Sequence, residues 1–245
     1  MNSIRPTIHA ALALVTIAFV AASPPHSARA DMIELAPTTD FTVEVTSGVA
    51  QPPNENETTL FVNQDSGFDL DGTATSVLKF DLSSIPTGSI IDSANLIINI
   101  TSNASVQSAV IDVIGFLSTN EDALASDGAT QPGEMTLGSF NPIFDENSIS
   151  LSQTTFQTLF DASSLGEFLA IRLQSPFPAS ATVDIELSAL DANGLPTALS
   201  PTLQVNFTPA AVPEPTSTTL LGLMAIAGGF TGWRQSRGLT KREDC

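Results

Sequence analysis

The acidic stretch "DSGFDLDG", residues 65–72, carries the side chains best suited to holding a metal ion. Asp65, Asp69 and Asp71 stand four and two residues apart, and two glycines lie among them. Carboxylate oxygens are the ligands that calcium prefers, and glycine lets a loop curl around an ion. The spacing differs from that of an EF-hand. We expect calcium at these three aspartates, as the one cofactor that the sequence indicates; the alternative is a solvated acidic turn.

Paired carboxylates are the other chemistry that this chain offers. Glycoside hydrolases use two such groups, one as an acid and one as a base or nucleophile. The candidate pairs are Glu121 with Asp122 and Asp145 with Glu146, and no feature of the sequence selects one of them. We therefore expect no catalytic residues and no enzyme. A secreted carboxylate-dependent glycoside hydrolase is the third interpretation of the chain, behind the two given below.

The residue types that are missing exclude most other chemistry. His9 and His26 lie near the N-terminus, Trp233 and Cys245 lie near the C-terminus, and the chain has no tyrosine. Residues 31–209 therefore lack His, Cys, Trp and Tyr. Within them, a His base, a Cys nucleophile, a zinc site built on His or Cys, and a disulfide are all excluded.

The charge of residues 31–209 is strongly one-sided. They hold 23 acidic residues against two basic ones, Lys79 and Arg172, which gives a formal net charge of −21. Such a field repels phosphate backbones, so nucleic acid is excluded as a partner. Cations or a cation-rich medium are the natural partners.

The elements that position these residues show a hydrophobic period of two. In residues 77–82, Leu78, Phe80 and Leu82 share one face, and Val77, Lys79 and Asp81 share the other. The same alternation runs through residues 41–45, 96–100, 181–189 and 203–207, and residues 110–116 and 168–174 are also strand-like. This pattern predicts half-buried antiparallel strands with one dry face and one wet face. The expected fold is an all-β, jelly-roll-like sandwich.

Turns and one short helix complete the predicted domain. Pro and Gly in Ile85–Ser89, and Asp, Asn and Gly in Asp191–Pro196, predict turns between strands. A helix is expected at Gln153–Phe160 with Ser152 as its N-cap. Residues 63–73 and 118–147 are not predicted as strands. A loop as long as the second is usually either functional or disordered.

The N-terminal residues 1–30 have the order of a secretory signal peptide. A basic start at Arg5 precedes an almost wholly apolar run, Ile8–Ala22, and a small-residue stretch that ends in "ARA". We expect cleavage after Ala30. The alternative is a retained membrane anchor, which the short apolar run and its "SPP" break disfavour.

The C-terminal residues 210–245 have a different order: a proline motif, an apolar run and a basic tail. Prolines hold a chain extended, as a protease cleft requires. The apolar run Thr218–Trp233 has 16 residues, which as a helix would be about 24 Å long, against roughly 30 Å for a bilayer core. The basic tail favours the cytoplasmic side. These features predict transient membrane association, with a permanent anchor as the alternative.

This order resembles the PEP-CTERM sorting signal, which bacteria that export exopolysaccharide use and which the membrane protease exosortase handles. The matching residues are Val212, Pro213, Glu214 and Pro215, followed by Arg234, Arg237, Lys241 and Arg242. The resemblance implies export, exosortase as a partner during export, and delivery to the cell surface or the medium.

Residues 75–102 resemble the DNRLRE family of extracellular β-sandwich domains, some of which are classed as carbohydrate-binding modules. The match consists of "FDLSSIP" at Phe80–Pro86, then Gly88, then Ile91, Ser93, Ala94, Leu96, Ile98 and Ile100. A second match covers residues 148–175 and includes Gly166, Ala170, Ile171 and Arg172. The resemblance implies a jelly-roll-like sandwich and a glycan role, and it supplies no catalytic residues.

Aromatic residues separate the remaining interpretations. Sugar-binding surfaces usually present Trp or Tyr rings, whereas residues 31–209 contain only Phe. Phe68, Phe140, Phe144 and Phe177 lie in loop-like context. We expect a cell-surface or exopolysaccharide-matrix protein with a structural or adhesive role. The alternative is a glycan-binding module, with its binding residues unknown; an exposed Phe platform would favour it.

Overall fold

The structure is a computed structural model, and it describes residues 29–46, 49–53, 58–64, 72–104, 109–163, 167–176, 183–191 and 193–210. Residues Ala28–Ala210 form one compact unit. The predicted signal peptide up to residue 28, the predicted calcium ligands Asp65, Asp69 and Asp71, and the whole predicted sorting motif lie outside the described residues. Among the residues that are described, no helix is both long and apolar enough to cross a bilayer.

The fold is mostly β, and every strand pairing is antiparallel, as the alternation predicts. The described strands are β1 (Asp31–Leu35), β2 (Thr39–Thr46), β3 (Val49–Ala50), β4 (Thr59–Gln64), β5 (Gly72–Asp81), β6 (Ile90–Asn103), β7 (Ile111–Ser118), β8 (Met135–Phe140), β9 (Asp145–Ser150), β10 (Phe168–Gln174), β11 (Val183–Ser188) and β12 (Thr202–Thr208). A 3-10 turn, η1 (Ala125–Gly128), and one α-helix, α2 (Gln153–Ala162), complete it.

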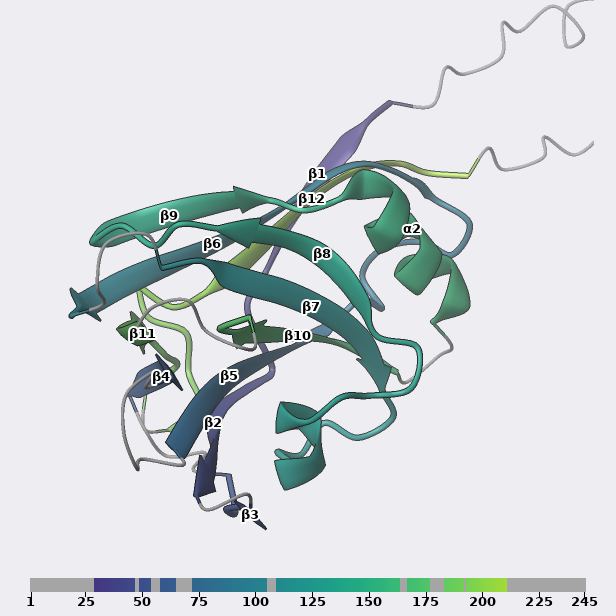
Figure 1. Ribbon diagram of the computed structural model, residues 1–245. Coiled ribbons are helices and arrows are strands. Elements are labelled where there is room, and N and C mark those ends of the chain that lie inside the picture. Colours follow the sequence, from purple (N-terminus) through teal and green to yellow (C-terminus); the bar gives the residue numbers. More distant parts are fainter. Residues whose placement is uncertain are drawn as a thin grey trace, which may run out of the picture. The chain divides into compact units, whose positions relative to one another are not determined.

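One continuous sheet curls around the core (Figure 1). The long strand β6 pairs with β12 and β11 along one edge and with β9 along the other, and β1 pairs with the far edge of β12. Strand β5 lies between β2 and β10, and β10 leads through β7 to β8. Strands β11 and β4 join the two halves. The sheet is therefore open and strongly curved.

The main core fills the inside of this curl. In β6, Leu96, Ile98 and Ile100 are buried, whereas Asn95 and Asn99 lie on the opposite, half-buried face. Strands β11 and β12 repeat the pattern. Burial of one face of each strand supplies the main driving force for folding. The predicted alternation is confirmed in these strands.

Helix α2 closes one end of the core, where Figure 1 shows it beside β7 and β8. Ser152 caps it by accepting a hydrogen bond from the Thr155 amide, as predicted. Its apolar face buries Phe156, Leu159 and Phe160. The helix approaches β7 so closely that a Cβ at Gly115 would lie 2.8 Å from Leu159 and 2.6 Å from Leu137. A larger residue there would have to push the Leu137 and Leu159 side chains aside.

The prediction that residues 118–147 contain no strand is wrong. Strand β8 pairs with β7, and β9 pairs with β6 from Asn95 to Ile100. Each contains one fully buried apolar side chain, Leu137 in β8 and Ile149 in β9. In β8, Met135 and Phe140 are only partly buried, and the rest of both strands is polar or small, so neither strand has a clear apolar alternation and their ladder hydrogen bonds determine their structure.

The prediction of one dry and one wet face is wrong for β5 and β10. Their outer face is buried under residues 119–134, which we call the cover segment. A second apolar cluster lies beneath it, made of Phe41, Val43, Val77, Phe116, Ala123 and Ala170. Lys79 and Arg172 share this face, and their side chains are only 0% and 2% exposed. The cover segment turns the outer face of these strands into a second core.

Candidate functional site

The cover segment is organised around Lys79. The Lys79 ammonium donates hydrogen bonds to the carbonyl oxygens of Asn120 at 2.8 Å and Asp122 at 2.6 Å, and to the Ser118 hydroxyl at 3.3 Å. It also forms a buried ion pair of 2.8 Å with the Asp127 carboxylate. Several oxygens thus surround one internal cation. This arrangement satisfies a charge that would otherwise be costly to bury.

Arg172 fastens the other end of the cover segment. Its Nη2 contacts Glu134 at 2.8 Å, its Nη1 donates to the carbonyl of Ala129, and its Nε donates to Gln174 at 2.8 Å. The guanidinium also stacks over the Phe116 ring, 5.8 Å from the ring centroid. Both ends of the segment are therefore held by buried cations.

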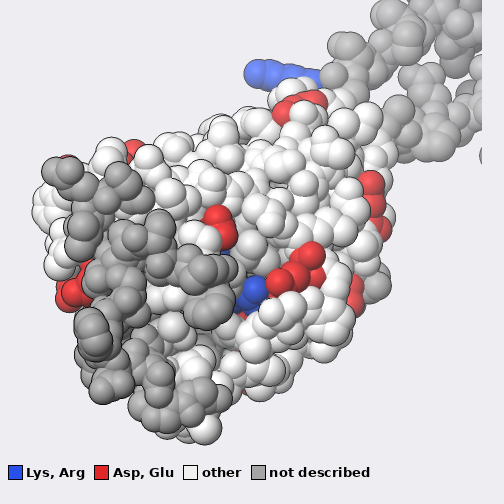
Figure 2. Space-filling view, in the orientation of Figure 1, with Lys and Arg blue, Asp and Glu red and all other residues white. Residues whose placement is uncertain are grey.

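This burial leaves the surface of residues 31–209 without basic side chains, because Lys79 and Arg172 are the two basic residues in that range. Figure 2 shows one face of the molecule, where acidic groups are scattered, a small blue patch lies among them and further blue atoms lie beside the grey end of the chain. An anionic ligand would find no cationic side chain on this surface.

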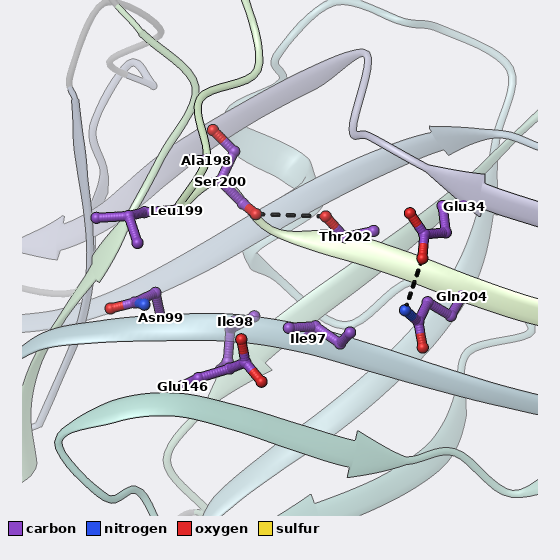
Figure 3. A pocket seen from close by; sticks show the side chains of 10 residues that line it. All are labelled: Glu34, Ile97, Ile98, Asn99, Glu146, Ala198, Leu199, Ser200, Thr202 and Gln204. Atoms are coloured by element: carbon purple, nitrogen blue, oxygen red, sulfur yellow. Dashed lines mark hydrogen bonds between the residues drawn. The ribbon is translucent and has the colours of Figure 1, made fainter.

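A shallow hollow of about 200 Å³ lies on the outer face of β1, β12 and β6, beside β9 and the segment before β12. Figure 3 shows amide, hydroxyl and carboxylate groups around it, with Ile97 and Leu199 as apolar lining. Cross-strand register builds this polar face. Gln204 donates to Glu34 at 2.9 Å, and the Ser150 hydroxyl donates to Asn95 at 2.9 Å.

Two carboxylates, Glu34 and Glu146, line the hollow at opposite ends (Figure 3). Glu34 lies on β1, opposite Gln204 on β12, and Glu146 lies three strands away on β9, opposite Asn99. Strand spacing and rise place their Cα atoms roughly 20 Å apart. The hollow thus has a carboxylate on each side of it, contributed by two strands that are not neighbours.

The turn between β8 and β9 presents two apolar side chains to solvent. Ile143 is 62% exposed and Phe144 is 69% exposed. The buried Asn147 side chain fixes the turn, since it donates to the carbonyls of Ile143 and Asp145 at 2.8 and 2.9 Å and accepts from the Ile143 amide. Asp145 adopts a φ of 88°, which is strained for a residue with a side chain. The backbone of the turn that carries the exposed Phe144 is therefore held by hydrogen bonds.

The other phenylalanines singled out from the sequence have different environments. Phe140 ends β8 and packs partly buried against the core, so its assignment to a loop is wrong. Phe68 and Phe177 lie outside the described residues. Phe144 is thus the ring among the four that the structure shows to be exposed.

The two acidic pairs that the sequence analysis names also lie in different environments. Glu121 and Asp122 are exposed in the cover segment, and the backbone carbonyl of Asp122 accepts a hydrogen bond from the Lys79 ammonium. Asp145 and Glu146 begin β9, and Glu146 lines the hollow. Within the described residues, no three acidic side chains gather as a metal site would require.

One titratable group that the sequence did not indicate is Asp40. Burial on β2 raises the pKa of its carboxyl to about 6, although the Leu190 amide donates to it at 2.7 Å. The Asp40 side chain joins β2 to the segment after β11. Its role is structural, because it does not line the hollow.

Comparison with known proteins adds no family to these observations. No protein-family model matches the chain, and no curated protein is significantly similar to it. Function has to follow from the residues and their geometry.

Proposed function

We propose that this chain is an exported protein, processed by an exosortase-type membrane protease, that becomes part of the cell surface or the exopolysaccharide matrix. Its role is structural or adhesive. Support comes first from the order of the terminal segments: a secretory signal in residues 1–30, and a Pro-Glu-Pro motif, apolar run and basic tail in residues 210–245. Such an order has no use in a chain that stays in the cytoplasm.

The position of the two ends of the folded unit is the observation that carries the proposal. Strand β1 pairs with β12, and Asp31 lies opposite Phe207. Figure 1 shows the two strands side by side. The expected signal cleavage falls directly before Asp31, and the sorting motif begins at Val212, a few residues beyond β12. Both expected processing signals thus join the domain at one place, so they can be handled without any rearrangement of the folded strands.

The finer fold assignment belongs to the same proposal. We place the domain among jelly-roll-like sandwiches of the DNRLRE type. The "FDLSSIP" segment supports this, because it runs from the end of β5 into a turn where Gly88 has a φ of 80°. Ser89 closes that turn by donating to the Pro86 carbonyl. The next strand, β6, then returns along the core.

Altering the sorting motif tests the proposal. The double variant Pro213→Ala, Pro215→Ala should leave the chain uncleaved and in the membrane fraction, whereas the unaltered protein reaches the surface or the medium. Pro196→Ala, in an exposed turn, is the matched control and should behave like the unaltered protein. Unchanged processing of the double variant would contradict the assignment of the motif.

A glycan-binding module is the second candidate, and the exposed Phe144 favours it. The ring is 69% exposed and stands two residues before Glu146, which lines the polar hollow. Pull-down with exopolysaccharide of the host tests this function. The unaltered protein should be retained and Phe144→Ala should be retained less. Equal retention of both proteins would remove the support that Phe144 gives to this candidate.

A further inference from the structure

We propose that the hollow on β1, β12 and β6 binds a glycan that carries protonated amino groups. The inference rests on the second candidate function, glycan binding, and names its site and its ligand class. Three features carry it: the mixed lining of the hollow, the sign of the charge around it, and an exposed ring two residues before one of its lining residues.

The lining suits a sugar because it combines apolar surface with short polar groups. Ile97 and Leu199, the latter 53% exposed, offer apolar contact. Asn99, Thr202 and Gln204 offer amide and hydroxyl groups that both donate and accept hydrogen bonds. A pyranose has an apolar C–H face and hydroxyls at its rim, so it can satisfy both kinds of contact at once.

The charge selects among sugars. Glu34 and Glu146 are exposed carboxylates at the two ends of the hollow, and its lining contains no basic residue. The two basic residues of the range 31–209 are buried in the cover segment. A uronate or sulfate would meet only like charge, whereas an ammonium group can form charge-assisted hydrogen bonds with either glutamate. Gln204 holds the Glu34 carboxylate in place for this contact.

The positions of the two carboxylates suit a ligand that reaches from one strand to another. Glu34 comes from β1 and Glu146 from β9, with β12 and β6 between them, so a ligand that contacts both extends across the hollow. Phe144 stands two residues before Glu146 in the chain. Asn147 already holds the backbone of its turn, so that backbone loses little conformational entropy when the ring stacks on a sugar.

Calorimetry with soluble oligosaccharides tests the proposal on protein purified from its host. The probes are a hexamer of β-1,4-linked glucosamine, its fully N-acetylated counterpart and an oligouronate of equal length. We expect the amine-bearing hexamer to bind at least about tenfold more tightly than the acetylated one, since acetylation removes the charge. The oligouronate should not bind.

Matched variants separate a site from general charge attraction. Glu34→Gln with Glu146→Gln should weaken binding of the amine-bearing hexamer by about tenfold, or about threefold for each carboxylate. Glu121→Gln with Asp122→Asn removes the same charge from the exposed part of the cover segment and should change the affinity less than twofold. Phe144→Ala should weaken both the amine-bearing and the acetylated ligand.

Three results would overturn the inference. Equal losses in the two double variants would mean that binding is diffuse attraction to an acidic surface. Equal affinity for both hexamers would refute the preference for amines but leave glycan binding intact. Binding of none of the probes and none of the host exopolysaccharide would refute glycan binding itself, while the proposal of an exported matrix protein would still stand.

Discussion

Replacing Lys79 with methionine should be among the most damaging single substitutions in the domain. Methionine fills a similar volume but has no charge and no donor. The substitution leaves the Asp127 carboxylate buried without its cation and leaves the carbonyls of Asn120 and Asp122 without their donor. Removing one partner of a buried ion pair costs about 3–5 kcal/mol. In a domain of this size that lowers Tm by about 6–20 °C.

Thermal and denaturant unfolding of the purified protein measures this effect. The double variant Lys79→Met, Asp127→Asn should be more stable than Lys79→Met alone, because no unpaired charge stays buried. Glu121→Gln, exposed in the same cover segment, should change the free energy of unfolding by less than about 0.5 kcal/mol. The reasoning is refuted if Lys79→Met lies within about 1 kcal/mol of the unaltered protein, or if the second substitution destabilises it further.

The remaining predictions concern pH, packing and calcium. The pKa of Asp40 is raised to about 6, so folding favours its protonated form, and this stability is lost as the pH rises through 6. Between pH 4 and pH 7 the unaltered protein should lose up to about 3 kcal/mol relative to Asp40→Asn, measured by denaturant unfolding; parallel curves would contradict this. Gly115→Ala should destabilise by about 1–3 kcal/mol through its clash with Leu137 and Leu159, and Gly138→Ala, at an ordinary 3.4 Å, should cost less. Millimolar calcium should raise Tm by about 3–5 °C. Sodium at equal ionic strength should not reproduce this rise, and Asp69→Asn with Asp71→Asn should abolish it; equal shifts with both salts would leave only a solvated turn.

The sequence predicts much of this fold because alternation reports directly on burial. The buried positions Val183, Ile185 and Leu187 of β11 follow the pattern, and the helix begins at its predicted cap, Ser152. These signals depend only on residues close together in the chain, so a single sequence is enough to recognise them. The helix runs two residues further than expected, to Ala162, as helix ends commonly do.

What the sequence does not predict depends on contacts between distant segments. Alternation places Lys79 on the face opposite Phe80, but it cannot say that a segment 40 or more residues later covers that face. A basic residue in a strand usually indicates solvent. Strands β8 and β9 could not be predicted from the sequence, because each has few buried apolar residues and depends on a partner strand for its structure.

The candidate site was visible only in part. Asn95, Asn99 and Gln204 occupy the outward positions of predicted strands. Glu34 lies on β1, which no pattern indicated, and only strand register brings it opposite Gln204. The exposure of Phe144 depends on the hydrogen bonds of Asn147, which are equally a matter of tertiary structure.

The mass of the mature protein tests the central claim most directly. Intact-mass analysis of the protein from its native host should find a chain that begins at or near Asp31 and ends close to Pro215. That result would mean that both terminal signals are removed and that the β-domain is what the cell delivers. Recovery of a chain that still carries Trp233 and Cys245 would contradict the account.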